Sequence, residues 1–175
     1  NRTGANTIAI RIYGNYALQN SYTNTVAQTD SFNVYSPGIF DLNGKTLNCY
    51  QFTANNASTT YLRNGTINCN LWSVSTTPAL FDCGTSTIIV TPYFAAAYAT
   101  FIGGNQTYNN VTFYSSATAR SVISNSNTFN KITFAHAVGV TPLGVSFTAG
   151  TTQTVGALDQ LNGTPGFKHV INSGN

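Results

Sequence analysis

The chain has very little charge. Of its 175 residues only 6% are charged, and it contains neither Glu nor Met. A typical soluble domain carries ~25% charged residues, whereas disordered chains combine high charge with few aromatic residues. With 11 Phe and 10 Tyr, this chain is instead expected to pack around an apolar core, as one domain.

The few charges that are present form no extended basic surface. Seven Lys and Arg against four Asp give a net charge of +3, but the basic residues are scattered singly along the chain. Nucleic-acid binding is therefore not expected. The most apolar stretch, IIVTPYFAAAYATFI at 88–102, contains Pro92 and falls short of the ~20 residues that a membrane span needs.

Several familiar catalytic motifs are missing. There is no GxGxxG after a strand, no P-loop, no GxSxG and no HExxH, so nucleotide binding, serine acyl transfer and zinc-protease chemistry are not expected. His136 and His169 lie far apart without a Cys or carboxylate at ligand spacing. Four dispersed Asp make a poor calcium site, so no metal and no other cofactor is expected.

The sequence repeats itself instead. FIGGNQTYNNVTF at 101–113 aligns without a gap to VISNSNTFNKITF at 122–134, with five identities that include Ile102 with Ile123. DLNGKTLNCY at 41–50 aligns in the same way to YLRNGTINCN at 61–70, and TSTIIVT at 85–91 lies about one period beyond it. A period of 20–22 residues is typical of a solenoid, in which each repeat is one coil.

Within each copy the residues alternate between apolar and polar, which indicates strands. The Leu scaffold of leucine-rich repeats is absent, and a jelly roll would not show gapless repeats. Equivalent residues of a parallel stack lie above one another. The expected columns are Val111 over Ile132 and Phe113 over Phe134 inside, Thr112 over Thr133 outside, and Asn109 over Asn130 in a turn.

Two segments resemble a known superfamily. SPGIFDLNGKTLNC at 36–49 resembles the opening coils of right-handed parallel β-helix proteins, the pectate-lyase-like superfamily, where a DLNGKTL turn and strand is common. SFTAGTTQTVGALDQLNGTPGFKHVINSGN at 146–175 is similar to a segment of large secreted or phage-borne β-helix proteins. The resemblance implies an all-β, right-handed parallel β-helix, and it spans lyases, hydrolases, adhesins and viral spikes.

The expected organisation is one domain in two parts. Ile8, Ile10 and Ile12 alternate as in a strand, so residues 1–35 are expected to form an N-terminal strand or arm and a first coil. Residues 36–175 are expected to form the β-helix stack.

One group of residues could form an active site on neighbouring coils. Asp41 and Asp82 are two periods apart, and Arg63 falls between them near the same edge. Enzymes that cleave polysaccharides use such converging carboxylates and bases. The alternative is that both Asp are turn residues that accept backbone N–H bonds, with Arg63 exposed to solvent.

Cysteines and sequons could be modified. Cys49 and Cys69 are expected on adjacent coils, either as a disulfide or as two free thiols in a core column, and Cys83 is left odd. Asn-x-Ser/Thr sequons are no more frequent than so much Asn, Ser and Thr would give by chance. Besides Asn1, the possible glycosylation sites are Asn56, Asn64, Asn105, Asn110 and Asn162.

Three functions fit this pattern. The first is a non-enzymatic structural or adhesive protein outside the cell, on a filament, fibre or virion, which associates with itself, with neighbouring surface proteins or with glycans. The second is a polysaccharide lyase or glycoside hydrolase. The third is an ice- or crystal-binding solenoid, which needs Thr-x-Thr on every coil; the stacked pairs Thr46/Thr66 and Thr112/Thr133 do not sustain that pattern.

Overall fold

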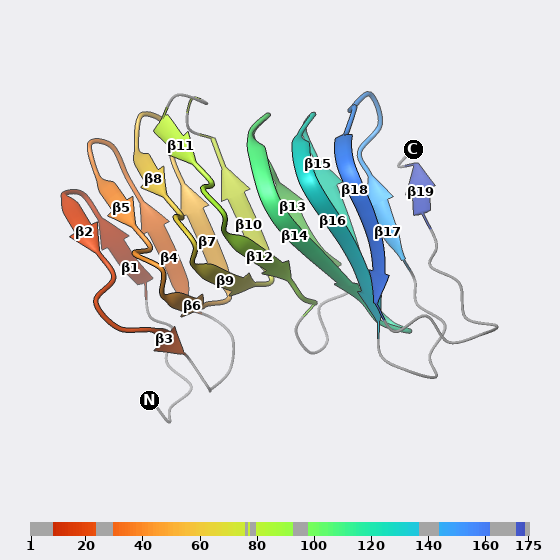
Figure 1. Cartoon of the computed structure of the whole chain (residues 1–175), viewed down its shortest axis with the longest axis horizontal. Helices are drawn as coiled ribbons and strands as arrows, with labels where there is room; N and C mark the ends of the chain where they lie inside the picture. The colour runs from red at the N-terminus through yellow and green to blue at the C-terminus, as the bar shows by residue number, and fades with distance from the viewer. Residues whose placement is uncertain are drawn as a thin grey trace.

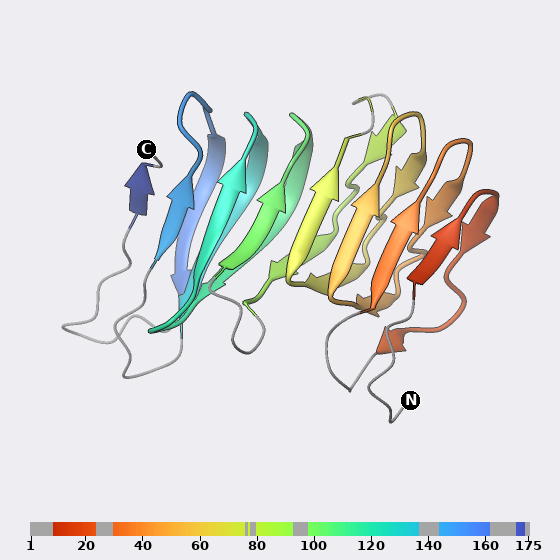
Figure 2. The same cartoon turned by 180° about the vertical axis from the view of Figure 1, so that it is seen from behind.

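The chain folds into stacked coils of β-strands. The computed structural model describes residues 9–23, 30–75, 77, 80–92, 98–136, 144–161 and 171–173. In both views the strands lie side by side along one axis, with β1 (Ala9–Ile12) and β19 (Ile171–Ser173) at opposite ends (Figures 1 and 2). The predicted all-β parallel β-helix is confirmed.

Three parallel sheets, named A, B and C here, make up the stack. In order along the stack, sheet A contains β1, β4 (Ser31–Val34), β7 (Gln51–Ala54), β10 (Leu71–Val74), β13 (Tyr98–Ile102), β15 (Arg120–Ser124), β17 (Val145–Phe147) and β19. Sheet B contains β2 (Asn15–Ala17), β5 (Ile39–Asp41), β8 (Thr59–Tyr61) and β11 (Phe81–Asp82). Sheet C contains β3 (Tyr22–Thr23), β6 (Thr46–Asn48), β9 (Thr66–Cys69), β12 (Thr87–Val90), β14 (Thr107–Ser115), β16 (Thr128–His136) and β18 (Thr154–Leu161).

The coils change shape along the stack. Each of the first four passes through sheets A, B and C in turn, and β11 is the last strand of sheet B among the described residues. Later coils cross from sheet A to the long strands of sheet C through a short turn, such as residues 103–106. The coil from Leu71 to Thr100 is also longer than the coil from Gln51 to Leu71, so the period is less uniform than the repeats predict.

The repeats set the strand register, with one correction. Thr46 pairs with Thr66, and Phe113 pairs with Phe134, as their alignment predicts. The alignment of Ile102 with Ile123 is wrong, because Phe101 is the residue that pairs with Ile123. The turn before β16 is one residue shorter than the turn before β14, which shifts the register between sheets A and C.

The interior is built from columns of apolar side chains. In sheet A, one column stacks aromatic rings at centroid distances of 6.1, 4.7 and 6.0 Å, from Phe32 through Phe52 and Trp72 to Phe101. Trp72 Nε1 donates to the hydroxyl of Tyr108 at 3.1 Å, and that hydroxyl donates to the carbonyl of Gly103 at 2.7 Å. These bonds satisfy the polar atoms that the large rings carry into the core.

The two longest strands, β14 and β16, interrupt their alternation at equivalent positions. In β14 and β16 the alternation of buried and outward residues breaks at 109–110 and at 130–131. Asn130 donates its side-chain amide to Asn109 Oδ1 at 3.2 Å. The predicted Asn109–Asn130 ladder therefore exists, but within strands and not in a turn. Of the predicted outward pair, Thr112 is half-buried and Thr133 is buried.

The N-terminal residues belong to the stack as far as they are described. β1 pairs with β4, β2 with β5, and β3 with β6, so residues 9–23 make a first coil. Residues 1–8 and 24–29 of the expected arm lie outside the described residues. Within the described ranges, no helix has the length and hydropathy of a membrane span.

Candidate functional site

The structure brings the three candidate catalytic residues to one edge of sheet B. Asp41 pairs with Tyr61 in register, and Tyr61 pairs with Asp82, so the two carboxylates share a column two strand spacings apart. Arg63 lies in the turn that follows Tyr61. The predicted convergence of these residues is therefore present.

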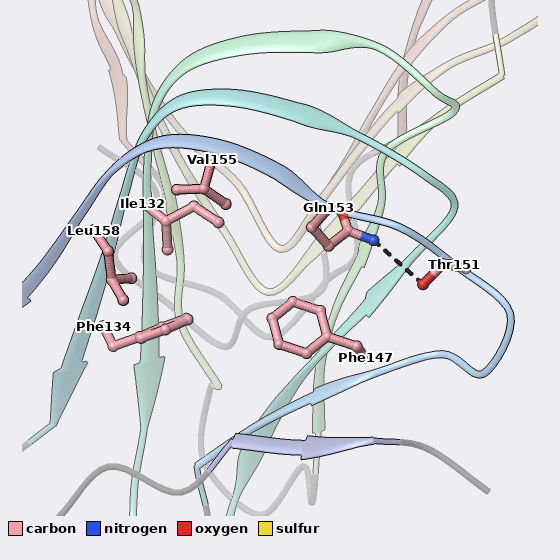
Figure 3. Close-up of a pocket in the computed structure, with 7 residues that line it drawn as sticks. All are labelled: Ile132, Phe134, Phe147, Thr151, Gln153, Val155 and Leu158. Atoms are coloured by element: carbon pink, nitrogen blue, oxygen red, sulfur yellow. Dashed lines mark hydrogen bonds between the residues drawn. The ribbon is translucent and has the colours of Figure 1, made fainter.

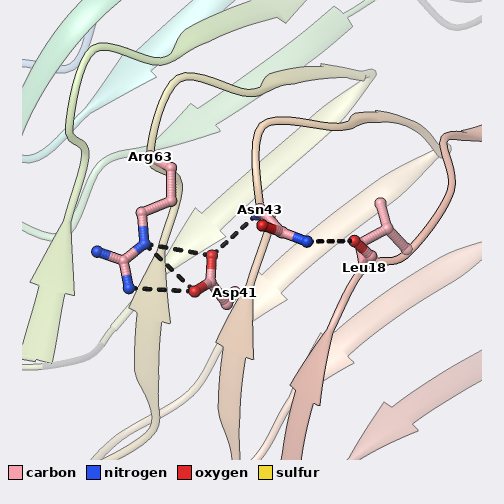
Figure 4. Close-up of polar contacts among 4 residues, drawn as sticks. All are labelled: Leu18, Asp41, Asn43 and Arg63. Carbon is pink, nitrogen blue, oxygen red and sulfur yellow. Dashed lines mark hydrogen bonds and ion pairs between the residues drawn. The ribbon is translucent and has the colours of Figure 1, made fainter.

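Arg63 and Asp41 form an exposed ion pair. Nε lies 3.3 Å from Oδ1 and 3.2 Å from Oδ2, and Nη2 lies 3.1 Å from Oδ2 (Figure 4). The guanidinium also lies over the ring of Tyr61, 4.6 Å from its centroid. Hydrogen bonding and charge from Asp41 raise the pKa of Arg63, and the charge of Asp82 adds to this. Arg63 is thus held against Asp41, with the charge of Asp82 near it.

Both carboxylates also hold turns. Asp41 Oδ1 accepts the N–H of Asn43 at 2.8 Å, and Asp82 Oδ1 accepts the N–H of Gly84 at 2.9 Å. Such bonds from Asp to a backbone N–H two residues on stabilise tight turns. They are the bonds that the turn interpretation predicts, although Arg63 is ion-paired and not simply solvated.

The turn residues adopt left-handed backbone conformations. Asn43, Arg63 and Gly84 have φ angles of 51°, 56° and 51°. Asn43 also donates its side-chain amide to the carbonyl of Leu18 at 3.2 Å, one coil below (Figure 4). This edge of the stack is therefore a ladder of similar turns tied together by side chains.

The remaining two carboxylates are also engaged. Asp30 is 2% exposed and accepts a hydrogen bond from the hydroxyl of Tyr22 at 2.6 Å. Asp159 pairs with Lys131 at 2.9 Å. The chain has four Asp and no Glu, and each of the four Asp side chains has a hydrogen-bond or ion-pair partner.

The chemistry open to the Asp41–Arg63–Asp82 group is limited. Two strand spacings correspond to ~9.6 Å, which is wider than the separation in a retaining glycosidase and at the upper limit for an inverting one. Proton transfer at Asp41 would also require the ion pair with Arg63 to open. As arranged, the group stabilises turns.

The residues that could bind a metal do not gather. Among the described residues, no group of three or more His, Cys, Asp or Glu is placed to hold a metal ion. His136 is buried at the end of β16, opposite Ser115. His169 lies outside the described residues.

The cysteines are free thiols, so the disulfide considered for Cys49 and Cys69 is not formed. Both thiols lie in the hydrophobic core, as the core-column alternative predicts, and burial raises the pKa of each. For Cys49 the neighbouring Cys69 adds to the shift. Cys83 is partly exposed in its turn, and burial together with the charge of Asp82 raises its thiol pKa.

The structure separates the sequons by accessibility. Asn56, Asn64 and Asn105 are exposed in turns, whereas Asn110 is half-buried within β14. Asn105 also accepts the N–H of Ser126 through Oδ1 at 3.0 Å. Asn1 and Asn162 lie outside the described residues.

A pocket of about 430 Å³ opens at the C-terminal end of the core. Figure 3 shows side chains from β16, β17, β18 and the turn before β18 around it: Ile132, Phe134, Phe147, Thr151, Gln153, Val155 and Leu158. Gln153 donates to Thr151 Oγ1 at 3.2 Å. Sequence reasoning missed this pocket, although Val155 and Leu158 continue the columns of Phe129 and Ile132. None of the described residues that line it is ionisable.

Comparison with known protein families, curated proteins and solved structures gives no match for this chain.

Proposed function

We propose that this is a non-enzymatic structural or adhesive β-helix protein of an extracellular surface, a subunit of a filament, fibre or virion spike. The resemblance of its turn and strand motifs to secreted and virion-associated members of the pectate-lyase-like superfamily fits this role. The observation that carries the proposal is the engagement of all four carboxylates in turns, ion pairs or a buried hydrogen bond. A general acid or base needs a carboxylate that is free to exchange a proton with substrate.

The ends of the stack favour an assembled state. Among the described residues, large apolar side chains are exposed at both ends, with Tyr13 and Tyr16 on one and Val155 and Leu158 on the other. The first and last strands of a parallel stack also present unpaired backbone groups, which pair readily with another chain. A surface with few charges does little to oppose such association.

The alternative is a polysaccharide lyase or hydrolase, supported by the shared column of Asp41 and Asp82 with Arg63 between them. A cleavage screen over neutral and acidic polysaccharides separates the two. The proposal predicts no soluble products from the wild-type protein.

The variants Asp41→Asn and Asp82→Asn complete that screen, with Asp159→Asn as the matched control, since Asp159 is an ion-paired Asp on a different face. Oligosaccharide release that both site variants abolish and the control retains would establish the enzyme and overturn the structural role.

A further inference from the structure

We propose that the outer face of sheet C from β6 to β14 binds a neutral, hydroxyl-rich polysaccharide that lies along the stack. The inference rests on the proposed adhesive role and names its partner. Two columns define the face. The threonine column is Thr46, Thr66 and Thr87, and the amide column is Asn48 and Asn68.

The threonine column is regular and stiff. Thr46 pairs with Thr66, and Thr66 pairs with Thr87, so three identical side chains follow one another at the ~4.8 Å spacing of neighbouring strands. β-Branched side chains have few accessible χ1 rotamers. The hydroxyl groups are therefore held in place before any ligand arrives, which lowers the entropy cost of binding.

The hydroxyls of this column are free. Each of the three threonines is half-buried, and within the described part of the chain none of their Oγ1 atoms makes a hydrogen bond. A hydroxyl can donate one hydrogen bond and accept two. The column thus offers a row of unused donors and acceptors.

The neighbouring amide column is held in place by its own ladder. Asn68 donates its side-chain amide to Asn48 Oδ1, and Asn48 donates to Thr23 Oγ1 at 2.9 Å. An Asn amide has two N–H donors, so each keeps one for a ligand. Ile89 pairs with Asn68 and continues this column with an apolar side chain, which can contact the C–H face of a sugar ring.

The charge of the face selects the class of polymer. On β6, β9, β12 and β14 the outward positions from Thr46 to Thr112 carry no charged side chain. The next strand has Lys131, which is paired with Asp159. Lys45 lies at the edge, in the turn before β6, and has no ion-pair partner among the described residues. An anionic polymer would find almost no counter-charge here, whereas a neutral glycan can exchange hydrogen bonds along several coils.

The test replaces the free hydroxyls with methyl groups. The variant Thr46→Val/Thr66→Val/Thr87→Val removes the column. The control is Thr53→Val/Thr59→Val/Thr100→Val, since these threonines are equally half-buried on strands of sheets A and B, and Thr53 Oγ1 differs only in accepting a bond from Gln51 Nε2. Binding is measured by retention on immobilised cellulose, chitin, mannan and β-1,3-glucan, with polygalacturonate as the acidic comparison. Trp72 fluorescence reports whether each variant is folded.

We expect the wild type and the control to be retained on at least one neutral polysaccharide, and the column variant to lose about tenfold or more in affinity, as the loss of several hydrogen bonds implies. Equal retention of the two triple variants, preference for polygalacturonate, or no retention on any neutral polymer would overturn the inference. If only the column variant loses self-association, the face binds a second copy of this chain and not a polysaccharide, which would also overturn the inference. The binding assay tests only this face. The cleavage screen tests the structural role separately, so failure of one can be told from failure of the other.

Discussion

At the scale of single residues, the turns at the edge of sheets B and C depend on left-handed backbone. Asn43 and Gly84 are residue types that adopt it readily, and the Asn-Gly dipeptide at 43–44 predicts a turn from the sequence. Arg63 has φ 56° without that intrinsic preference. In this conformation Arg63 pairs with Asp41 and contacts the ring of Tyr61. The sequence alone does not identify these partners, because they depend on how the coils stack.

Gly84 is the turn position least able to accept a side chain. A Cβ there would lie 2.3 Å from the carbonyl oxygen of Arg63, on a backbone with φ 51°. Gly84→Ala is therefore expected to lower the free energy of unfolding by more than about 1 kcal/mol in urea denaturation.

Gly14→Ala is the matched control, because a Cβ at Gly14 meets no atom within 4 Å and its φ is not positive. We expect that control to change stability by less than about 0.5 kcal/mol. Equal effects of the two substitutions would refute the tight turn at Gly84.

The buried thiols predict a loss of stability at alkaline pH. In the unfolded chain Cys49 and Cys69 ionise near their ordinary pKa of 9.0, whereas burial raises the pKa of both in the folded state. Above the ordinary value the unfolded chain releases protons that the folded chain keeps, so the free energy of unfolding falls as pH rises. Below it this contribution is fully present.

Urea denaturation between about pH 8 and 10.5 measures that slope. The variant Cys49→Val/Cys69→Val should lose less stability over this range than the wild type. Parallel curves for the two proteins would show that the thiols do not carry the effect.

At the scale of elements, the aromatic column of sheet A is the main internal support. Trp72 is fully buried, stacks on Phe52 at 4.7 Å and bonds to Tyr108. Trp72→Ala is expected to cost about 3–5 kcal/mol of unfolding free energy, because it leaves a large cavity and removes the indole donor.

Leu71→Ala is the control for that experiment, since Leu71 lies on the same strand but is half-buried on its outer side. Thermal or urea denaturation followed by circular dichroism should show an effect of no more than about 1 kcal/mol for this variant. A small effect at Trp72 would mean that the column is not a main support.

The repeats predict the strands and their register where the turns of neighbouring coils have the same length. Between β6 and β9 the copies align without a gap, so strand register follows from sequence identity alone. Phe32, Phe52 and Trp72 also recur at equal intervals along the chain, which is a further sequence signal for the same register. The end of sheet B after β11 could not be predicted, because it depends on how the short turn 103–106 packs against the coil before it.

The position of the candidate site could be predicted from the sequence, but the interactions of its side chains could not. The repeat period places Asp41 and Asp82 at one edge with Arg63 between them, and the structure confirms this. Whether Arg63 pairs with Asp41 or leaves it free depends on side-chain conformations that spacing does not determine. The pairing matters for function, because it occupies the carboxylate that an enzyme would need.

At the scale of the whole molecule, the described residues leave large apolar side chains exposed at both ends of the stack, and the chain carries few charges. Only 6% of its residues are charged, and four of these form the ion pairs Arg63–Asp41 and Lys131–Asp159. Exposed apolar side chains and a surface with few charges do little to oppose contact between copies. The structural role therefore predicts association between copies.

Negative-stain electron microscopy of the native material, combined with light scattering of the purified chain over a range of concentrations, tests that role most directly. The account predicts ordered filaments, fibres or spikes, and a mass that grows with concentration. A monomer at all concentrations, with no ordered assembly in the native material, would contradict it.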